Sequence, residues 1–282
     1  MTPPERRHPR RPPPSRLTTV FAVAGSLVGL FLVLPVFVVI PVSFSGSSFL
    51  EFPPRSLSLR WYHEYFSSHT WIDSTVNSVK VALLTSALAT VVGTAAALAM
   101  QRARFRFRSA LTGLILSPMI LPHIVLAISI YAVFARLKLI GSIWGLVAVY
   151  TMLATPFVYL NVSAALQSLE PALEQAAMSL GATRWRALWH VTFPLIRPGI
   201  ISGALLAMIL AFDEVVIALF ITGTTAVTLP KTMWDGIRTE INPTIAAVSS
   251  FLIVGYVALL AAASAVRARA IARSPGHVTA DN

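Results

Sequence analysis

The chain contains no cysteine and few charged residues. The absence of cysteine from its 282 residues excludes disulfide bonds and thiolate metal sites. Charged residues make up 12% of the sequence, against roughly 25% in a typical soluble domain. Hydrophobic residues make up 56%, and the mean hydropathy is +0.73. A chain this apolar is expected to be embedded in a membrane.

The motifs of nucleotide hydrolysis and of common hydrolytic enzymes are also missing. The three lysines of the chain follow Val79, Leu137 and Pro230, so it has no glycine-lysine pair and no P-loop. The HExxH zinc motif, the GxSxG nucleophile motif and the Cys/His spacing of metal sites do not occur either. The sequence therefore predicts no enzyme activity, no metal site and no cofactor bound by this chain.

Long apolar runs, by contrast, are frequent. Most are about 20 residues or longer, which is the length that a helix needs to cross a bilayer. They predict an all-α polytopic membrane protein whose transmembrane domain covers residues 17–267, with about six transmembrane helices at residues 17–42, 78–100, 110–135, 141–166, 198–222 and 245–267. Pro118, Pro122 and Pro156 fall inside these spans, where the missing N–H is expected to kink the helix.

The two ends of the chain differ from the spans in composition. Residues 1–16 are Pro-rich and basic and are predicted to form a disordered tail, and residues 268–282 form a second tail. A secretory signal peptide is the alternative at the N-terminus. The apolar run that follows is longer than the roughly 7 to 15 residues expected of a signal peptide, so we interpret it as an uncleaved first span.

Basic residues are unevenly distributed between the loops. Of the 22 Lys and Arg residues, 15 lie in residues 1–16, in the loop at residues 101–109, in the polar segment at residues 168–197 and after Val266. Because basic residues stay mainly on the cytoplasmic side of a membrane, both termini and the polar segment are predicted to be cytoplasmic. The net charge of +11 is thus a topology signal, and no nucleic-acid partner is expected.

Asp213 and Glu214 lie together inside the apolar run at residues 198–222. A charged residue inside a membrane costs about 2.5 to 3.5 kcal/mol on the insertion scale, so the pair requires a wet cavity or a partner. Adjacent residues of a helix point about 100° apart, so at most one of the two is expected to face a pore. Two interpretations stay open, a carboxylate that attracts a cationic solute and a structural partner for nearby donors. His123, among apolar neighbours, is interpreted as a core histidine.

Residues 168–197 form a polar, helix-forming segment between two spans. Pro171 suits the first turn of a helix, and Gly181 suits the left-handed residue that ends one. We therefore expect one short helix over about residues 168–180 and a second over residues 184–190.

The first of these short helices is predicted to be amphipathic. Its apolar residues recur at helical spacing and its polar residues lie on the other face, the two sets being Leu169, Leu173, Ala176, Ala177 and Leu180, and Glu170, Glu174 and Gln175. Such a helix can sit in a groove of a partner protein or lie on the surface of the bilayer, and the spacing alone leaves both open.

The segment EQAAMSLGATRWRALWHVTFPLI, which begins at Glu174, resembles the EAA loop of ABC importer permease subunits, which docks on the ATPase subunit. A resemblance to spermidine/putrescine permeases extends over most of the chain after residue 40. It is carried by Leu59-Arg60-Trp61-Tyr62, Ser117-Pro118-Met119-Ile120-Leu121-Pro122, Phe212-Asp213-Glu214-Val215, Thr228-Leu229-Pro230 and Asn242-Pro243-Thr244. Two positions depart from the family pattern. Gln175 stands where the Glu of the EAA motif falls, and His123 stands where relatives often carry an acidic residue.

The resemblance implies the type I fold of ABC importer permeases, with a cytoplasmic coupling helix in the loop at residues 168–197. It implies a set of ATPase-coupling residues, namely Glu174, Gln175, Ala176, Ala177, Gly181 and Arg184. Asp213 and Glu214, which lie in one of the matching motifs, are the candidate residues of the substrate pathway. No residue of this chain is expected to be catalytic, since ATP and Mg would be bound by the partner ATPase.

The same resemblance implies the partners and the cargo. The partners are a second, homologous permease subunit, two ATP-binding subunits, an extracytoplasmic solute-binding protein and membrane lipid, in the inner membrane of a bacterial cell. The cargo is expected to be a polyamine such as spermidine or putrescine. The alternatives are an importer of another small solute, such as an amino-acid derivative, a sugar phosphate or a metal chelate, and a membrane scaffold or channel with no ATPase.

Overall fold

The structure is a computed structural model that describes residues 16–102, 107–239 and 243–272, with only the backbone described at residues 16–19, 102 and 259–272. The described residues form helices joined by loops and turns, and they contain no named strand. The chain divides into two compact units, one made of Met1–Tyr65 with Ile241–Asn282 and the other of Phe66–Glu240.

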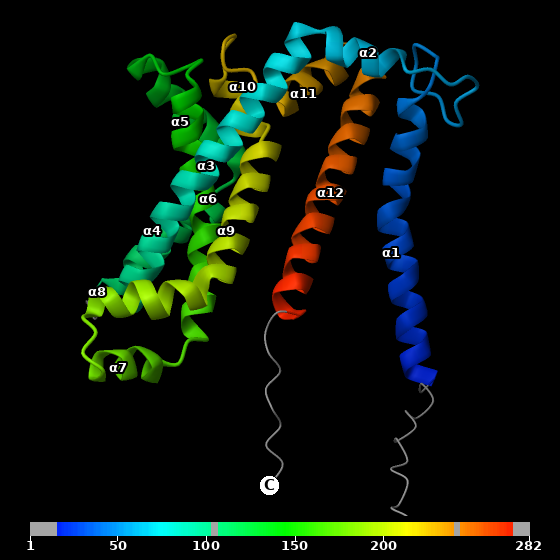
Figure 1. Cartoon of the computed structure of the whole chain (residues 1–282). Coiled ribbons are helices and arrows are strands. Elements are labelled where there is room, and N and C mark those ends of the chain that lie inside the picture. Colours follow the sequence, from blue (N-terminus) through cyan, green and yellow to red (C-terminus); the bar gives the residue numbers. More distant parts are fainter. Residues whose placement is uncertain (1–15, 103–106, 240–242, 273–282) are drawn as a thin grey trace, which may run out of the picture. The chain divides into compact units, whose positions relative to one another are not determined.

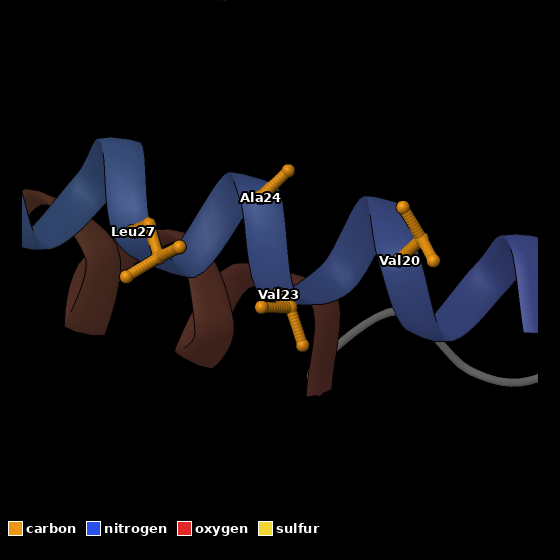
Figure 2. A pocket seen from close by; sticks show the side chains of 4 residues that line it. All are labelled: Val20, Val23, Ala24 and Leu27. Atoms are coloured by element: carbon orange, nitrogen blue, oxygen red, sulfur yellow. The ribbon is translucent and has the colours of Figure 1, made fainter.

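The first unit contains two long helices that contact each other, α1 (Arg16–Ser43, blue in Figure 1) and α12 (Thr244–Ala272, orange to red). The apolar side chains of α1 are exposed on several sides between Val20 and Leu34. Four of them, Val20, Val23, Ala24 and Leu27, line a shallow apolar depression of about 300 Å³ (Figure 2). An apolar helix with such a surface is suited to contact lipid chains or other helices in a membrane.

The loop after α1 is joined to the first residues of α2 (Arg60–Ser67) by side-chain hydrogen bonds. The indole Nε1 of Trp61 donates to the carbonyl of Ser45 at 2.8 Å, and the hydroxyls of Ser43 and Tyr62 lie 2.7 Å apart. Trp61 is buried by this packing. Trp61 and Tyr62 therefore have a structural role within this unit.

The second unit is built around α3 (His69–Arg102), α6 (Ile143–Gln167) and α9 (Phe193–Asp213), which all pack against one another (Figure 1). Two glycines allow the close approach of these helices to Val158. A Cβ atom at Gly93 would lie 2.7 Å from the Cβ of Val158, and one at Gly203 would lie 2.9 Å from its Cα. Small residues at such crossings are typical of membrane helix packing. The three helices form the scaffold that positions the loops at both ends.

Shorter helices complete the second unit. On the side of α3 and α6 lies the pair α4 (Arg108–Ile120) and α5 (His123–Leu137), and α9 is followed by α10 (Val216–Ile221) and α11 (Leu229–Thr239). Between α6 and α9 the chain forms α7 (Pro171–Ser179), α8 (Arg184–Ala187) and the π-helix η1 (Leu188–Thr192). Side chains of α3 hold the start of α11, since the hydroxyl of Ser78 accepts from the N–H of Leu229 at 2.8 Å.

The six predicted spans fall in α1, α3, the pair of α4 and α5, α6, α9 with α10, and α12. Among the described residues, four stretches are long and apolar enough to cross a membrane, Val20–Ser43, His69–Gln101, Ile143–Gln167 and Arg184–Asp213, and the bent pair of α4 and α5 would make a fifth. The sixth predicted span falls in α12, of which the apolar part with described side chains is Thr244–Ala258.

Two of the predicted spans are interrupted in the structure. The span at residues 110–135 is interrupted after Ile120, and α4 and α5 are bent by 101° at this point. The span at residues 198–222 is interrupted at Glu214, and its helix begins before it, at Phe193, inside the segment assigned to the polar loop. Pro118 and Pro156 lie inside helices that continue past them, so of the three prolines only Pro122 lies at an interruption.

Candidate functional site

The two interrupted helices of the second unit meet at their interruptions. His123 is the first residue of α5, and its Nδ1 lies 3.0 Å from Oε2 of Glu214, which separates α9 from α10. Helices α5 and α10 also pack against each other. Non-helical backbone at membrane depth is tolerated where it is buried in protein or lines a cavity, so this meeting point is a candidate for the transport pathway.

The interruption between α4 and α5 follows directly from the sequence. Pro122 has no N–H to donate to the preceding turn, and its ring disfavours helical conformation at Leu121. Leu121 accordingly has an extended backbone, with φ −76° and ψ 134°. The chain then re-enters a helix at His123.

The interruption between α9 and α10 has no proline or glycine to explain it. Glu214 has an extended backbone, with φ −72° and ψ 108°, and its own carboxylate supports the break. Oε1 of Glu214 accepts a hydrogen bond from the N–H of Ile217 at 3.0 Å. One of the N–H groups that the start of a helix leaves without an internal partner is thereby satisfied.

Three residues contact Glu214 through polar groups, namely His123, Ile217 and Tyr150. Its side chain is only 6% exposed, and its two carboxylate oxygens contact His123 and Ile217. Its carbonyl oxygen accepts from the hydroxyl of the fully buried Tyr150 at 2.9 Å. A buried carboxylate is tolerated only with such partners, because removing a charge from water is strongly unfavourable.

Asp213 lies in a different environment, although it is the neighbouring residue. It is the last residue of α9, and it is exposed where Glu214 is buried. The predicted divergence of about 100° between Asp213 and Glu214 assumed that both lie on one continuous helix. This assumption is wrong, because α9 ends at Asp213. Of the two carboxylates, that of Asp213 is the exposed one.

The interpretation of His123 as a core histidine is wrong. Its side chain is 42% exposed, and its ring contacts Glu214 rather than apolar neighbours alone. The sequence carried one signal for this contact. A histidine at the first residue after a helix-breaking proline and a carboxylate in another span are both costly in a membrane, and pairing them lowers the cost of each.

The polar loop forms the second candidate site, at the opposite end of α9 from Asp213 (Figure 1). Helix α7 begins at Pro171 and is followed by Gly181, which has a φ of +91°. The N–H of Gly181 donates to Met178 at 3.0 Å, and that of Ala182 donates to Ala177 at 3.1 Å. The predicted left-handed glycine at the end of this helix is confirmed, and the helix is shorter than predicted at both ends.

The periodicity predicted that Glu174 lies on an outward polar face of α7. The structure does not place it there. Its side chain is half-buried, and its Oε1 accepts a hydrogen bond from the hydroxyl of Thr192, which is fully buried in η1. This hydrogen bond therefore links α7 to η1, the turn that leads into α9. Gln175 and Ala176 are exposed, Ala177 is half-buried, and Leu180 is 89% exposed.

The π-helix places Thr192 at this contact. In η1 the N–H of Phe193 donates to Leu188, five residues back, so this turn holds one residue more than an α-helical turn. Along the same stretch, the rings of Trp185 and Trp189 meet edge to face at 5.7 Å, and those of Trp189 and Phe193 stack at 4.6 Å. The predicted helix over residues 184–190 is thus α8 continued by η1.

A small pocket lies between α7 and α8. Its volume is about 230 Å³, and it is lined by Glu174, Met178, Arg184 and Ala187. Arg184 is exposed at its rim, and the hydroxyl of Thr183 accepts from the N–H of Arg186 at the start of α8. Of the predicted coupling residues, the structure brings Glu174 and Arg184 to one pocket and leaves Gln175 and Ala176 on the open surface.

A polar loop with a helix that ends at a glycine, and charged residues where membrane helices are interrupted, are features typical of membrane permease subunits. The chain belongs to the family of binding-protein-dependent transport system inner membrane components, whose model matches residues 89–273. The resemblance stated from the motifs is confirmed, and the chain is a permease subunit of an ABC importer. The family consists of membrane permeases, and its related proteins are transporter subunits rather than enzymes.

Relatives with assigned names cover most of this chain. The spermidine/putrescine transport system permease protein PotC of Haemophilus influenzae is 29% identical over 234 residues, which are 83% of this chain and 91% of the relative. The putrescine transport system permease protein PotI of Escherichia coli K12 is 32% identical over 261 residues, which are 86% of this chain and 92% of the relative.

The fold is also similar to a solved structure. A chain of a bacterial ABC transporter involved in the import of the acidic polysaccharide alginate matches with a TM-score of 0.63 and 17% sequence identity. The match covers 91% of this chain and 99% of the other. At this identity the likeness concerns the fold alone, and it agrees with the predicted ABC importer permease fold.

Proposed function

We propose that this permease subunit imports a polyamine such as putrescine or spermidine. The observation that carries the proposal is the exposed carboxylate of Asp213 at an interrupted span, in a chain whose named relatives are polyamine permeases. A carboxylate at membrane depth attracts the ammonium groups of an amine where a neutral pathway would not. An importer of another small solute, such as an amino-acid derivative, a sugar phosphate or a metal chelate, is the alternative that the test below separates.

The proposed assembly contains this chain, a homologous permease subunit, two ATP-binding subunits and an extracytoplasmic binding protein that delivers the amine. ATP and Mg are bound by the ATP-binding subunits. The exposed face of α7, with Gln175 and Ala176, docks on one of them together with Leu180, the residue that follows α7. When the ATP-binding subunits close, α7 moves, and the contact of Glu174 with Thr192 carries that movement to α9 and so to Asp213.

Uptake by the complete importer tests the cargo. In bacterial cells that lack their own amine transporters, expression of this chain with the subunits encoded beside it is expected to give ATP-dependent uptake of labelled putrescine or spermidine. Cells without this chain provide the control. Uptake of a sugar phosphate, an amino-acid derivative or a metal chelate in place of either amine would contradict the polyamine function but leave the importer intact.

The proposed orientation places both termini and α7 in the cytoplasm of a cell whose inner membrane holds the chain. Single cysteines at two exposed positions of this cysteine-free chain test it, Thr224→Cys between α10 and α11 and Ser179→Cys at the end of α7. An impermeant maleimide added to intact cells is expected to label Thr224→Cys and not Ser179→Cys.

Permeabilised cells without the ATP-binding subunits provide the control for this labelling. Both cysteines are expected to react there, since no membrane or partner covers Ser179. Labelling of Ser179→Cys in intact cells would reverse the orientation and would exclude docking of a cytoplasmic ATPase on α7.

A further inference from the structure

We propose that one face of the helical stretch at residues 184–197 binds the headgroups of anionic phospholipids. The stretch comprises α8, η1 and the first residues of α9. Its basic-aromatic face consists of five exposed residues, Trp185, Arg186, Trp189, His190 and Arg197. The inference concerns the membrane surface at this end of α9 and does not depend on the cargo.

The helical stretch has one buried side and one open side. The buried side chains are Ala187, Leu188, Thr192 and Ile196, none of which is more than 8% exposed. Trp185 and Trp189, by contrast, are 67% and 50% exposed. The stretch is therefore packed into the second unit on one side, and the other side leaves two large indole rings for a partner outside the chain.

The aromatic rings of this stretch form a continuous row. Trp185 and Trp189 meet edge to face, and Trp189 stacks on Phe193. Arg197 follows Phe193 by four residues within α9, and it continues the row because residues four apart are neighbours on a helix. Tryptophan is enriched where a membrane meets water, since the indole has an apolar body and a polar N–H. A row of such rings that ends in an arginine is suited to the level of lipid headgroups.

The charge of the basic-aromatic face is complementary to an anionic headgroup. No Asp or Glu occurs at residues 175–212. Within the part of the chain that the structure describes, no carboxylate forms an ion pair with Arg186 or Arg197. A guanidinium group can bind a phosphate through two parallel N–H donors. The two arginines are thus available for the phosphate groups of lipids that carry a net negative charge.

The direction of the stretch also suits a position at the membrane surface. In Figure 1 the yellow-green stretch that begins at α8 runs across the lower ends of the longer helices, and α9 then turns upward along them. Helix α7 lies farther out than this stretch in the same view. An interfacial helix typically follows the membrane plane and carries basic and aromatic residues. These observations favour lipid on the basic-aromatic face and leave α7 to the ATP-binding subunit.

Quenching of indole fluorescence by brominated lipids tests the proposal, because bromine quenches an indole that it contacts. The complete importer is placed in nanodiscs of phosphatidylcholine that contain increasing shares of brominated phosphatidylglycerol or of brominated phosphatidylcholine. The signal of the two indoles is the difference between the wild type and the double variant Trp185→Phe/Trp189→Phe. Half of the quenching is expected at an about tenfold lower share of brominated phosphatidylglycerol than of brominated phosphatidylcholine.

Variants that remove single charges test the role of the arginines. Arg186→Gln and Arg197→Gln should each raise the half-quenching share of brominated phosphatidylglycerol by about three- to fivefold, the effect of one basic residue at an anionic surface. Arg136→Gln is the matched control and should leave this share unchanged. It removes an exposed charge from the last turn of α5, close to the point where the N–H of Gly141 donates to Ile221 of α10.

Two results would overturn the inference. Equal half-quenching shares for the two lipids would show that the basic-aromatic face meets the membrane without a preference for anionic headgroups. Absence of quenching by either lipid would show that protein covers this face, and quenching that begins only after removal of the ATP-binding subunits would identify them as the cover. The measurement requires no transport, so a failure of the polyamine proposal would leave its result unchanged.

Discussion

The Asp213→Asn variant is expected to import amine at least about tenfold more slowly than the wild type while reaching the membrane in normal amount. Asn preserves the size of the side chain and removes the charge. A hydrogen bond to a charged group contributes about 1.5 to 3 kcal/mol, and 1.4 kcal/mol corresponds to a factor of ten. Because Asp213 is exposed at the end of α9, its replacement should not disturb the packing of the helices.

Glu214→Gln provides the matched comparison, since it removes the charge of the neighbouring carboxylate. This carboxylate is buried and bonded to His123 and Ile217, so its replacement is expected to weaken the helix interruption more than the attraction of cargo. Initial rates of amine uptake, normalised to membrane abundance, should therefore fall further in Asp213→Asn than in Glu214→Gln. Wild-type rates in both variants would show that the pair is structural and would remove the local support for a cationic cargo.

The difference between these two carboxylates illustrates what the sequence could and could not predict. Apolar runs and their length predict helices in a membrane, because the bilayer leaves few other solutions for the backbone. The interruption at Glu214 is not encoded by a local breaker. It is stabilised by Tyr150, which lies 64 residues earlier, and by His123, so no pattern of spacing along α9 could have predicted it.

The polar loop at residues 168–197 likewise contains one feature that the sequence predicts and one that it does not predict. Gly181 could be predicted to adopt a left-handed conformation, because a glycine that follows an amphipathic stripe is the usual end of a helix. The inward position of Glu174 could not, since periodicity assigns a carboxylate to the solvent face. The π-turn at residues 188–192 brings the hydroxyl of Thr192 to that carboxylate, and a π-turn leaves no clear signal in the sequence.

The Gly181→Val variant is expected to insert in the membrane, to retain at least about tenfold less ATP-binding subunit on purification and to lose uptake correspondingly. The φ of Gly181 is +91°, and a β-branched residue rarely adopts this conformation. Apart from Gly181 and its two chain neighbours, no described residue has an atom within 4 Å of a Cβ placed at Gly181, so the effect would arise from the backbone rather than from a clash. The turn between α7 and α8 would have to change, and the exposed face of α7 would turn away from its partner.

Two control variants and one independent test variant make this interpretation specific. Gly113→Val lies at a site that is equally open but has no positive φ, and it should retain the ATP-binding subunits. Gly181→Asn should retain more of them than Gly181→Val, since Asn tolerates positive φ better than Val. Glu174→Lys should release them by another route, because the anchor of α7 to Thr192 is lost while the turn at Gly181 is unchanged. Retention of the ATP-binding subunits and normal uptake in both Gly181→Val and Glu174→Lys would mean that α7 is a surface helix and that coupling occurs elsewhere.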